Sequence, residues 1–139
     1  MKTRFSSLVT LKKSTMDKSE RVIQQANADL KNANIALEHA YDSLQDIDSP
    51  LKGHISDLLA QRTLLSSQRD IITHNTEWVN FAKRQLDAAK EQLKIDMIEF
   101  EKFKYLELQE IKKILKIRQM QESKALDEVA LMTHGRRDK

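Results

Sequence analysis

The sequence predicts an all-α protein, a long two-helix antiparallel coiled-coil hairpin with an overhanging C-terminal helix. Two observations support this fold. Apolar residues recur at coiled-coil spacing through most of the chain. The only proline, Pro50, lies close to Gly53, and after it no glycine or proline occurs until Gly135. The composition agrees, because 32% of the 139 residues are charged, only 5% are aromatic and there is no cysteine.

The first helix is expected over about residues 3–47, as part of a single domain spanning 1–139. Apolar residues there step by three and four positions without a miss, as in the a/d seam of a coiled coil. The seam contains Ile23, Ala26, Leu30, Ala33, Leu37, Ala40, Leu44 and Ile47. Because large and small residues alternate, a partner helix can approach closely.

The turn is expected over about residues 48–54. Ser49 suits a helix N-cap, and Pro50 suits the first helical position, where its missing N–H costs nothing. Gly53 permits a bend just beyond. A long parallel dimer without a bend is the alternative, and the pairing of Pro50 with Gly53 disfavours it.

The second helix is expected over about residues 55–133. An apolar residue occupies every seventh position from Leu51 to Phe100. The later neighbouring seam positions hold Ala82, Ala89 and Phe103, and the earlier ones hold Gln61, Gln68 and Asn75.

A tight bend predicts that position i faces roughly position 100 minus i. Phe5 would then lie near residues 93–100, and Ile47 near Leu51 and Ile55. Residues 103–133 would overhang with an exposed apolar face that needs a partner. Gly135 is expected to stop the helix, leaving 134–139 as a basic tail.

Charge is polarised along the predicted hairpin. Residues 1–21 carry a net charge of +4, residues 38–57 carry −4, and residues 101–139 carry +3. The open end that holds both termini is therefore basic, and the turn end is acidic. Solvated charges on a thin rod are the ordinary explanation, but here the basic end coincides with the apolar overhang.

The sequence offers no support for catalysis, cofactor binding or metal binding. A two-helix rod has almost no pocket, and neither glycine belongs to a phosphate-binding loop. The four histidines have no i,i+3 or i,i+4 pairing that could chelate a metal ion. No apolar run is long enough to insert into a membrane, and no basic aromatic cluster suggests nucleic acid. We expect a cytoplasmic, non-enzymatic protein.

A second apolar stripe lies one position before the main stripe of the second helix. It consists of Leu64, Ile71 and Trp78, with Phe81 one turn further on. Two interpretations remain open. The stripe widens the helix seam, or it forms a partner-docking face anchored by Trp78 and Phe81.

Both ends of the chain resemble the flagellar FliJ family of type III export proteins. The opening "RFSSLVTLKKSTMDKSERV" is similar to the family's start, and "ALDEVALMTHGRRDK" is similar to its C-terminal segment. The resemblance covers the whole chain and implies a non-enzymatic stalk, like the γ subunit of a rotary ATP synthase. Other stalk proteins of injectisome-type secretion share these features.

The resemblance implies three kinds of partner: a hexameric export ATPase (FliI-like), an export gate protein (FlhA-like) and export chaperones. It places the gate-binding patch early in the second helix, at Leu64, Gln68, Ile71 and Asn75, and Trp78 follows on the same stripe. Gln68 stands where the family has an aliphatic residue, and Asn75 where it has a histidine. The implied location is cytoplasmic and peripheral to the inner membrane at the flagellar base.

The basic open end supplies the candidate ATPase contacts, because it suits a pore lined by acidic and aliphatic groups. These candidates are Arg4, Lys12, Lys13, Lys112, Lys113, Lys116 and Arg118. The alternative function is a coiled-coil scaffold or adaptor that self-associates through the overhang, with no ATPase involved.

Overall fold

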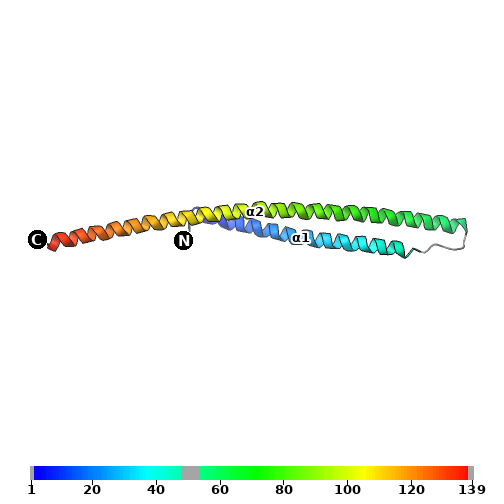
Figure 1. The fold of residues 1–139 in the computed structure, drawn as a ribbon, viewed down its shortest axis with the longest axis horizontal. Coiled ribbons are helices and arrows are strands. Elements are labelled where there is room, and N and C mark those ends of the chain that lie inside the picture. Colours follow the sequence, from blue (N-terminus) through cyan, green and yellow to red (C-terminus); the bar gives the residue numbers. More distant parts are fainter. Residues whose placement is uncertain (1, 48–53, 138–139) are drawn as a thin grey trace. The chain divides into compact units, whose positions relative to one another are not determined.

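The computed structural model describes residues 2–47 and 54–137, and in these two ranges it contains two helices and no strand. The helices are α1 (Ser6–Gln45) and α2 (Ile55–Arg137) (Figure 1). They pack against each other, so the predicted all-α helical hairpin is confirmed. The turn features predicted at Ser49, Pro50 and Gly53 lie outside the described residues.

The first turn of α1 is fixed by a reciprocal cap. The Thr3 N–H donates to the Ser6 hydroxyl at 2.8 Å, and the Phe5 N–H donates to the Thr3 hydroxyl at 3.1 Å. These bonds satisfy main-chain donors that the helix leaves without an internal acceptor. The cap thus lies at Thr3, and regular α-helix follows from Ser6, slightly after the predicted start at about residue 3.

A similar bond marks the start of α2. The His54 N–H donates to the Asp57 carboxylate at 3.3 Å, which also places a negative charge in the first turn. At the other end, α2 continues through Gly135 to Arg137, so the predicted stop at Gly135 is wrong. Gly135 does not have the positive φ of a helix-terminating glycine. A glycine can still occupy a helical position, where it destabilises the helix by about 1 kcal/mol relative to alanine.

The chain divides into two units, and both helices contribute to each. The central unit is Asp17–Ile95. The terminal unit consists of Met1–Met16 and Asp96–Lys139.

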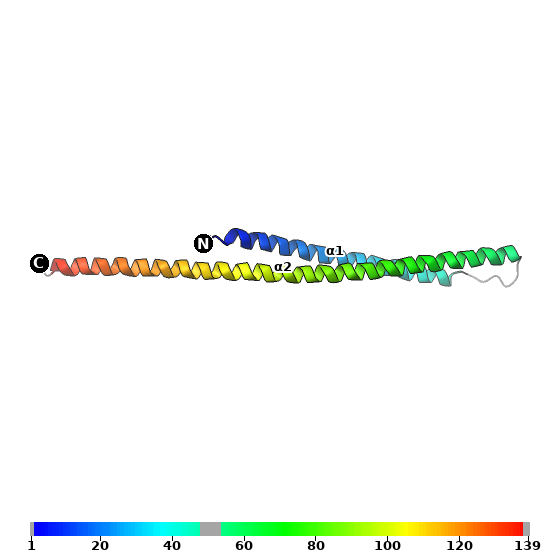
Figure 2. The same cartoon turned by 90° about the horizontal axis from the view of Figure 1, so that it is seen from above.

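In the central unit, α1 and α2 lie side by side and antiparallel (Figure 1, Figure 2). Ala33, Val79 and Ala82 form its buried cluster, with Leu30 and Leu37 packed against them. Ala26 and Ala40 are also buried, and the other predicted first-helix seam residues are half-buried. The alternation of large and small residues therefore predicted the buried face of α1 correctly.

In the terminal unit, the first turns of α1 lie along α2. Among its described residues, Met16 and Asp96 are buried, whereas Val9, Phe100 and Phe103 are only half-buried. Two ion pairs, Arg4 with Glu110 and Lys12 with Glu99, join the helices here.

The predicted pairing register is wrong by about three helical turns. In the central unit Gln68 contacts Ala40 and Asn75 contacts Ala36, so paired residue numbers sum to 108 and 111 rather than 100. In the terminal unit the two ion pairs give sums of 111 and 114. A heptad stripe fixes which face is buried but leaves the sliding position open, because each shift by a heptad presents the stripe again.

Because the register is shifted, the residues of α2 that have no α1 residue opposite them differ from those predicted, at both ends of α2. In the central unit, α2 starts beyond the end of α1, so Ile47 does not face Ile55, and residues 54–60 are all exposed. In the terminal unit, Phe103 and Leu106 are half-buried, and continuous exposure runs from 115 to 136. The overhang predicted to begin at 103 therefore begins later.

Candidate functional site

The second apolar stripe lies on α2 in the central unit. Leu64, Ile71 and Trp78 are 53%, 48% and 40% exposed. Phe81, one turn after Trp78, is 52% exposed. These side chains remain accessible while the seam beside them is closed by other residues.

The two polar members of the predicted patch face α1 instead. The Gln68 side-chain amide donates to the Ala40 carbonyl at 2.8 Å, and the Asn75 amide donates to the Ala36 carbonyl at 3.4 Å. Both side chains are half-buried. A side-chain amide within the seam needs such an acceptor, because burial without one is costly.

The structure therefore separates the predicted patch into two groups. Leu64, Ile71 and Trp78 form an exposed stripe, which we call the α2 stripe, whereas Gln68 and Asn75 position α1. About half of each stripe residue is exposed to water, so these side chains are accessible to a partner.

A shallow hollow lies next to the α2 stripe within the central unit. It is lined by Ala26, Asp29, Trp78, Phe81, Ala82 and Gln85. The two alanines are almost fully buried and form its floor. The Gln25 side-chain amide donates to Oδ1 of Asp29 at 2.9 Å. We call this feature the aromatic hollow.

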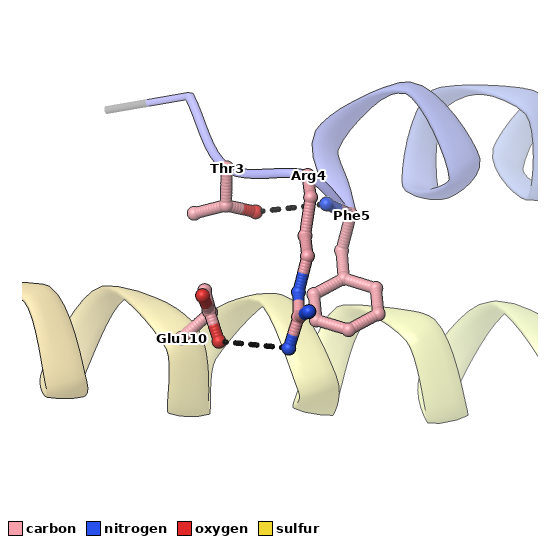
Figure 3. Close-up of polar contacts among 4 residues, drawn as sticks. All are labelled: Thr3, Arg4, Phe5 and Glu110. Atoms are coloured by element: carbon pink, nitrogen blue, oxygen red, sulfur yellow. Dashed lines mark hydrogen bonds and ion pairs between the residues drawn. The ribbon is translucent and has the colours of Figure 1, made fainter.

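Three of the predicted basic contacts lie in the α1 part of the terminal unit. Arg4 pairs with Glu110 at 3.5 Å and lies 5.0 Å from the Phe5 ring centroid (Figure 3). Lys12 pairs with Glu99 at 3.7 Å. Arg4 and Lys12 thus hold the start of α1 against α2, a role that their charge alone did not reveal.

Lysines also cover the faces of two phenylalanine rings on α2. Lys12 and Lys102 lie 5.5 Å and 5.8 Å from the Phe103 centroid. The Phe100 ring has Lys13 at 5.6 Å and Lys104 at 5.7 Å. Such cations are attracted to the negative faces of the rings.

The remaining predicted basic contacts lie where α2 has little or no cover. Lys112, Lys113, Lys116 and Arg118 are exposed, and none of them makes an ion pair or ring contact with another described residue. Leu115 and Ile117, which lie between them, are 43% and 47% exposed. The seven predicted cations are therefore of two kinds, four exposed on α2 and three near the packed start of α1.

Sequence reasoning missed Glu99, Glu110, Lys102 and Lys104. A partial signal was present, since Glu99, Lys102 and Lys104 lie within four residues of Phe100 or Phe103, but the wrong register hid the contacts of Glu99 and Glu110 with Lys12 and Arg4. In the described ranges, no cluster of side chains could hold a metal ion, and no helix is long and apolar enough to cross a membrane.

Two long helices packed against each other define an all-α protein of coiled-coil type. The family model described as "Flagellar FliJ protein" matches residues 1–139 of the chain. The chain belongs to the flagellar FliJ family, a non-catalytic family with a flagellar export-related role. Searches of curated proteins and of solved structures found no match.

Proposed function

We propose that this protein is a stalk component of the flagellar type III export apparatus. It binds the hexameric export ATPase through the terminal unit and promotes ATPase assembly and activity. It contacts the export gate protein through α2 and also binds export chaperones. In this role it is cytoplasmic and peripheral to the inner membrane at the flagellar base.

The family match over the whole chain carries this proposal. The terminal unit supports it physically, because Lys112, Lys113, Lys116 and Arg118 alternate with exposed aliphatic side chains. Such a segment can bind a surface that presents acidic and aliphatic groups, with the charges steering the encounter. Arg4, Lys12 and Lys13 contribute by holding or flanking the helix pair.

The α2 stripe is the proposed gate-binding surface. Leu64, Ile71 and Trp78 are accessible on the central unit, and half-exposed aliphatic and aromatic side chains are typical anchors of a helical interface. In this assignment Gln68 and Asn75 act indirectly, because their amides bond to α1.

The ATPase assignment is tested by measuring ATP hydrolysis by the cognate export ATPase with and without this protein. The variant Lys112→Glu with Lys113→Glu should reduce the stimulation several-fold, because it reverses two accessible charges. The pair Lys12→Glu with Lys13→Glu should reduce it too, partly by releasing the start of α1 from Glu99 and the phenylalanine rings.

A matched control is Lys83→Glu with Lys90→Glu, two exposed lysines on α2 in the central unit. This control should stimulate hydrolysis as the native protein does. Full stimulation by both terminal-unit variants at moderate salt would contradict the assignment.

The gate assignment is tested with Leu64→Ala combined with Ile71→Ala. Binding to the cytoplasmic part of the gate protein should be lost, while helicity and the melting temperature stay nearly native, because both side chains are about half exposed. A large loss of thermal stability would instead mean that these residues belong to the helix seam.

Self-association is the second candidate function. Leu126, Val129, Leu131 and Met132 are each at least 59% exposed at the end of α2, and a second copy could cover them. Sedimentation equilibrium distinguishes the two. A monomer at micromolar concentration supports the stalk, and a tight dimer that fails to stimulate the ATPase supports the scaffold.

A further inference from the structure

The aromatic hollow has features that neither the helix seam nor the α2 stripe explains. Phe81 is 52% exposed and lies outside the predicted seam positions, and Trp78 borders the hollow from the previous turn. Ala26 and Ala82 form a floor without bulky side chains. The result is a recess with two aromatic walls, large enough for one side chain.

The hollow also contains a carboxylate. Gln25 bonds to Oδ1 of Asp29, and Oδ2 has no partner among the described residues. The remaining polar wall is Gln85. A carboxylate beside two aromatic rings is the arrangement that binds a guanidinium or ammonium group, because the ring faces and the oxygen both carry negative potential.

The terminal unit shows that lysines of this chain do occupy aromatic faces. Phe100 and Phe103 each have two lysine ammonium groups within 6 Å of the ring centroid. By contrast, no cation of the described residues lies over Trp78 or Phe81. The cation-binding faces in the central unit are therefore open to another molecule.

We propose that the aromatic hollow binds a single basic side chain, arginine above all, presented by an apolar segment of a partner protein. The guanidinium contacts Oδ2 of Asp29 and the faces of Trp78 and Phe81. Arginine fits better than lysine because its planar group stacks on aromatic rings while donating to a carboxylate. Neighbouring apolar side chains of the partner cover the exposed edges of the rings.

Charge near the hollow argues for a partner other than a second copy of this chain. The exposed basic segment of the chain carries four cations, Lys112, Lys113, Lys116 and Arg118, without an acid between them. The hollow offers one carboxylate, and the charged residues that flank Trp78 and Phe81 on α2 balance, with Lys83 and Arg84 against Glu77 and Asp87. A segment with one cation matches the single carboxylate of the hollow, whereas a segment with four cations leaves three without a partner there.

Trp78 is the only tryptophan of the chain, and it borders both the hollow and the α2 stripe, so its fluorescence reports binding at this face of α2 and the variants below assign that binding to the hollow. The probe is a short helical peptide with one arginine flanked by leucines on one face. The reference peptide has citrulline, an uncharged isostere, at the same position. We expect a saturable change in Trp78 fluorescence with the arginine peptide and roughly tenfold weaker binding of the citrulline peptide.

Two variants assign the contacts. Asp29→Asn should weaken binding of the arginine peptide roughly tenfold and leave binding of the citrulline peptide unchanged. Phe81→Ala should weaken binding of both peptides. The matched control, Asp42→Asn, removes another exposed α1 carboxylate of the central unit and should change nothing. Circular dichroism verifies that each variant keeps its helices.

Equal binding of the two peptides would overturn the proposal, as would binding of neither or an unchanged arginine affinity in Asp29→Asn. A further result against the proposal would be a change in Trp78 fluorescence with protein concentration alone, in the absence of peptide. This change would have to disappear in the variant Lys112→Glu with Lys113→Glu. That result would identify the occupant as a second copy of the chain. The experiment needs neither the ATPase nor the gate protein, so its failure leaves the proposed function standing.

Discussion

The central and terminal units use the same two helices but hold them together differently. The central unit packs small residues, with Ala33 fully buried and Ala82 and Val79 nearly so, and Gln68 and Asn75 bond to α1 carbonyls. The terminal unit relies on half-buried phenylalanines, lysines over their rings and two ion pairs. The first arrangement excludes water, and the second keeps its contacts partly solvated.

This difference indicates which unit contributes more to the stability of the helix pair and which unit can open more easily. Close packing of alanines depends on fitted volume, so a small change of size is felt strongly. Partly solvated rings and ions contribute less, because water competes for each contact. The terminal unit can therefore release the start of α1 at lower cost than the central unit can separate its helices.

The largest expected effect comes from enlarging the centre of the alanine seam. Ala33→Leu should destabilise the protein by about 1–3 kcal/mol, because a leucine there must push α2 away from α1. Thermal unfolding measured by circular dichroism checks this. Ala28→Leu is the control, since Ala28 is exposed on the same helix and should tolerate the change. Equal melting temperatures for the two variants would contradict close packing.

An intermediate effect is expected from removing a covered ring in the terminal unit. Phe103→Ala should cost about 1–2 kcal/mol, less than a fully buried phenylalanine, because the ring is half-buried. Hydrogen exchange should become faster in residues 6–16 and stay unchanged around Ala33. Tyr105→Ala, which removes an aromatic residue that is 60% exposed, should leave exchange in residues 6–16 as it is. Faster exchange throughout both units would show that they unfold together.

The smallest effect is expected from an ion pair. Glu110→Gln removes the partner of Arg4, whose side chain is 72% exposed, and should cost less than about 0.5 kcal/mol. The midpoint of urea unfolding, compared at low and high salt, measures it. Glu122→Gln on the uncovered part of α2 provides the baseline for losing a carboxylate. A loss above 1 kcal/mol would mean that the pair carries more of the terminal unit than its exposure suggests.

The sequence was sufficient to predict the helices and their buried faces, because periodicity reports which side of a helix avoids water. Val79, Leu86 and Ala89 were predicted in the seam and are buried. Register could not be predicted in the same way, since it depends on specific bonds such as that of Gln68 to Ala40. The same bonds explain why the predicted gate patch divided.

The predicted basic contacts show most clearly what the sequence could not predict. Charge counting located Arg4 and Lys12, but their partners Glu110 and Glu99 depend on the register. The aromatic hollow was also only partly foreseen. Trp78 and Phe81 were predicted as possible anchors of a docking face, whereas Asp29 and Ala26 come from the opposing helix α1.

The bonds from Gln68 and Asn75 end on main-chain oxygens, and every residue type supplies one. Substituting Ala36 or Ala40 leaves the acceptor in place, so these two hydrogen bonds depend on the side chains of α2 only, whereas the size of Ala40 is set separately by its burial in the seam. During evolution the residues on the exposed surface of α1 can therefore change while the side-chain amides of Gln68 and Asn75 maintain the register of the two helices.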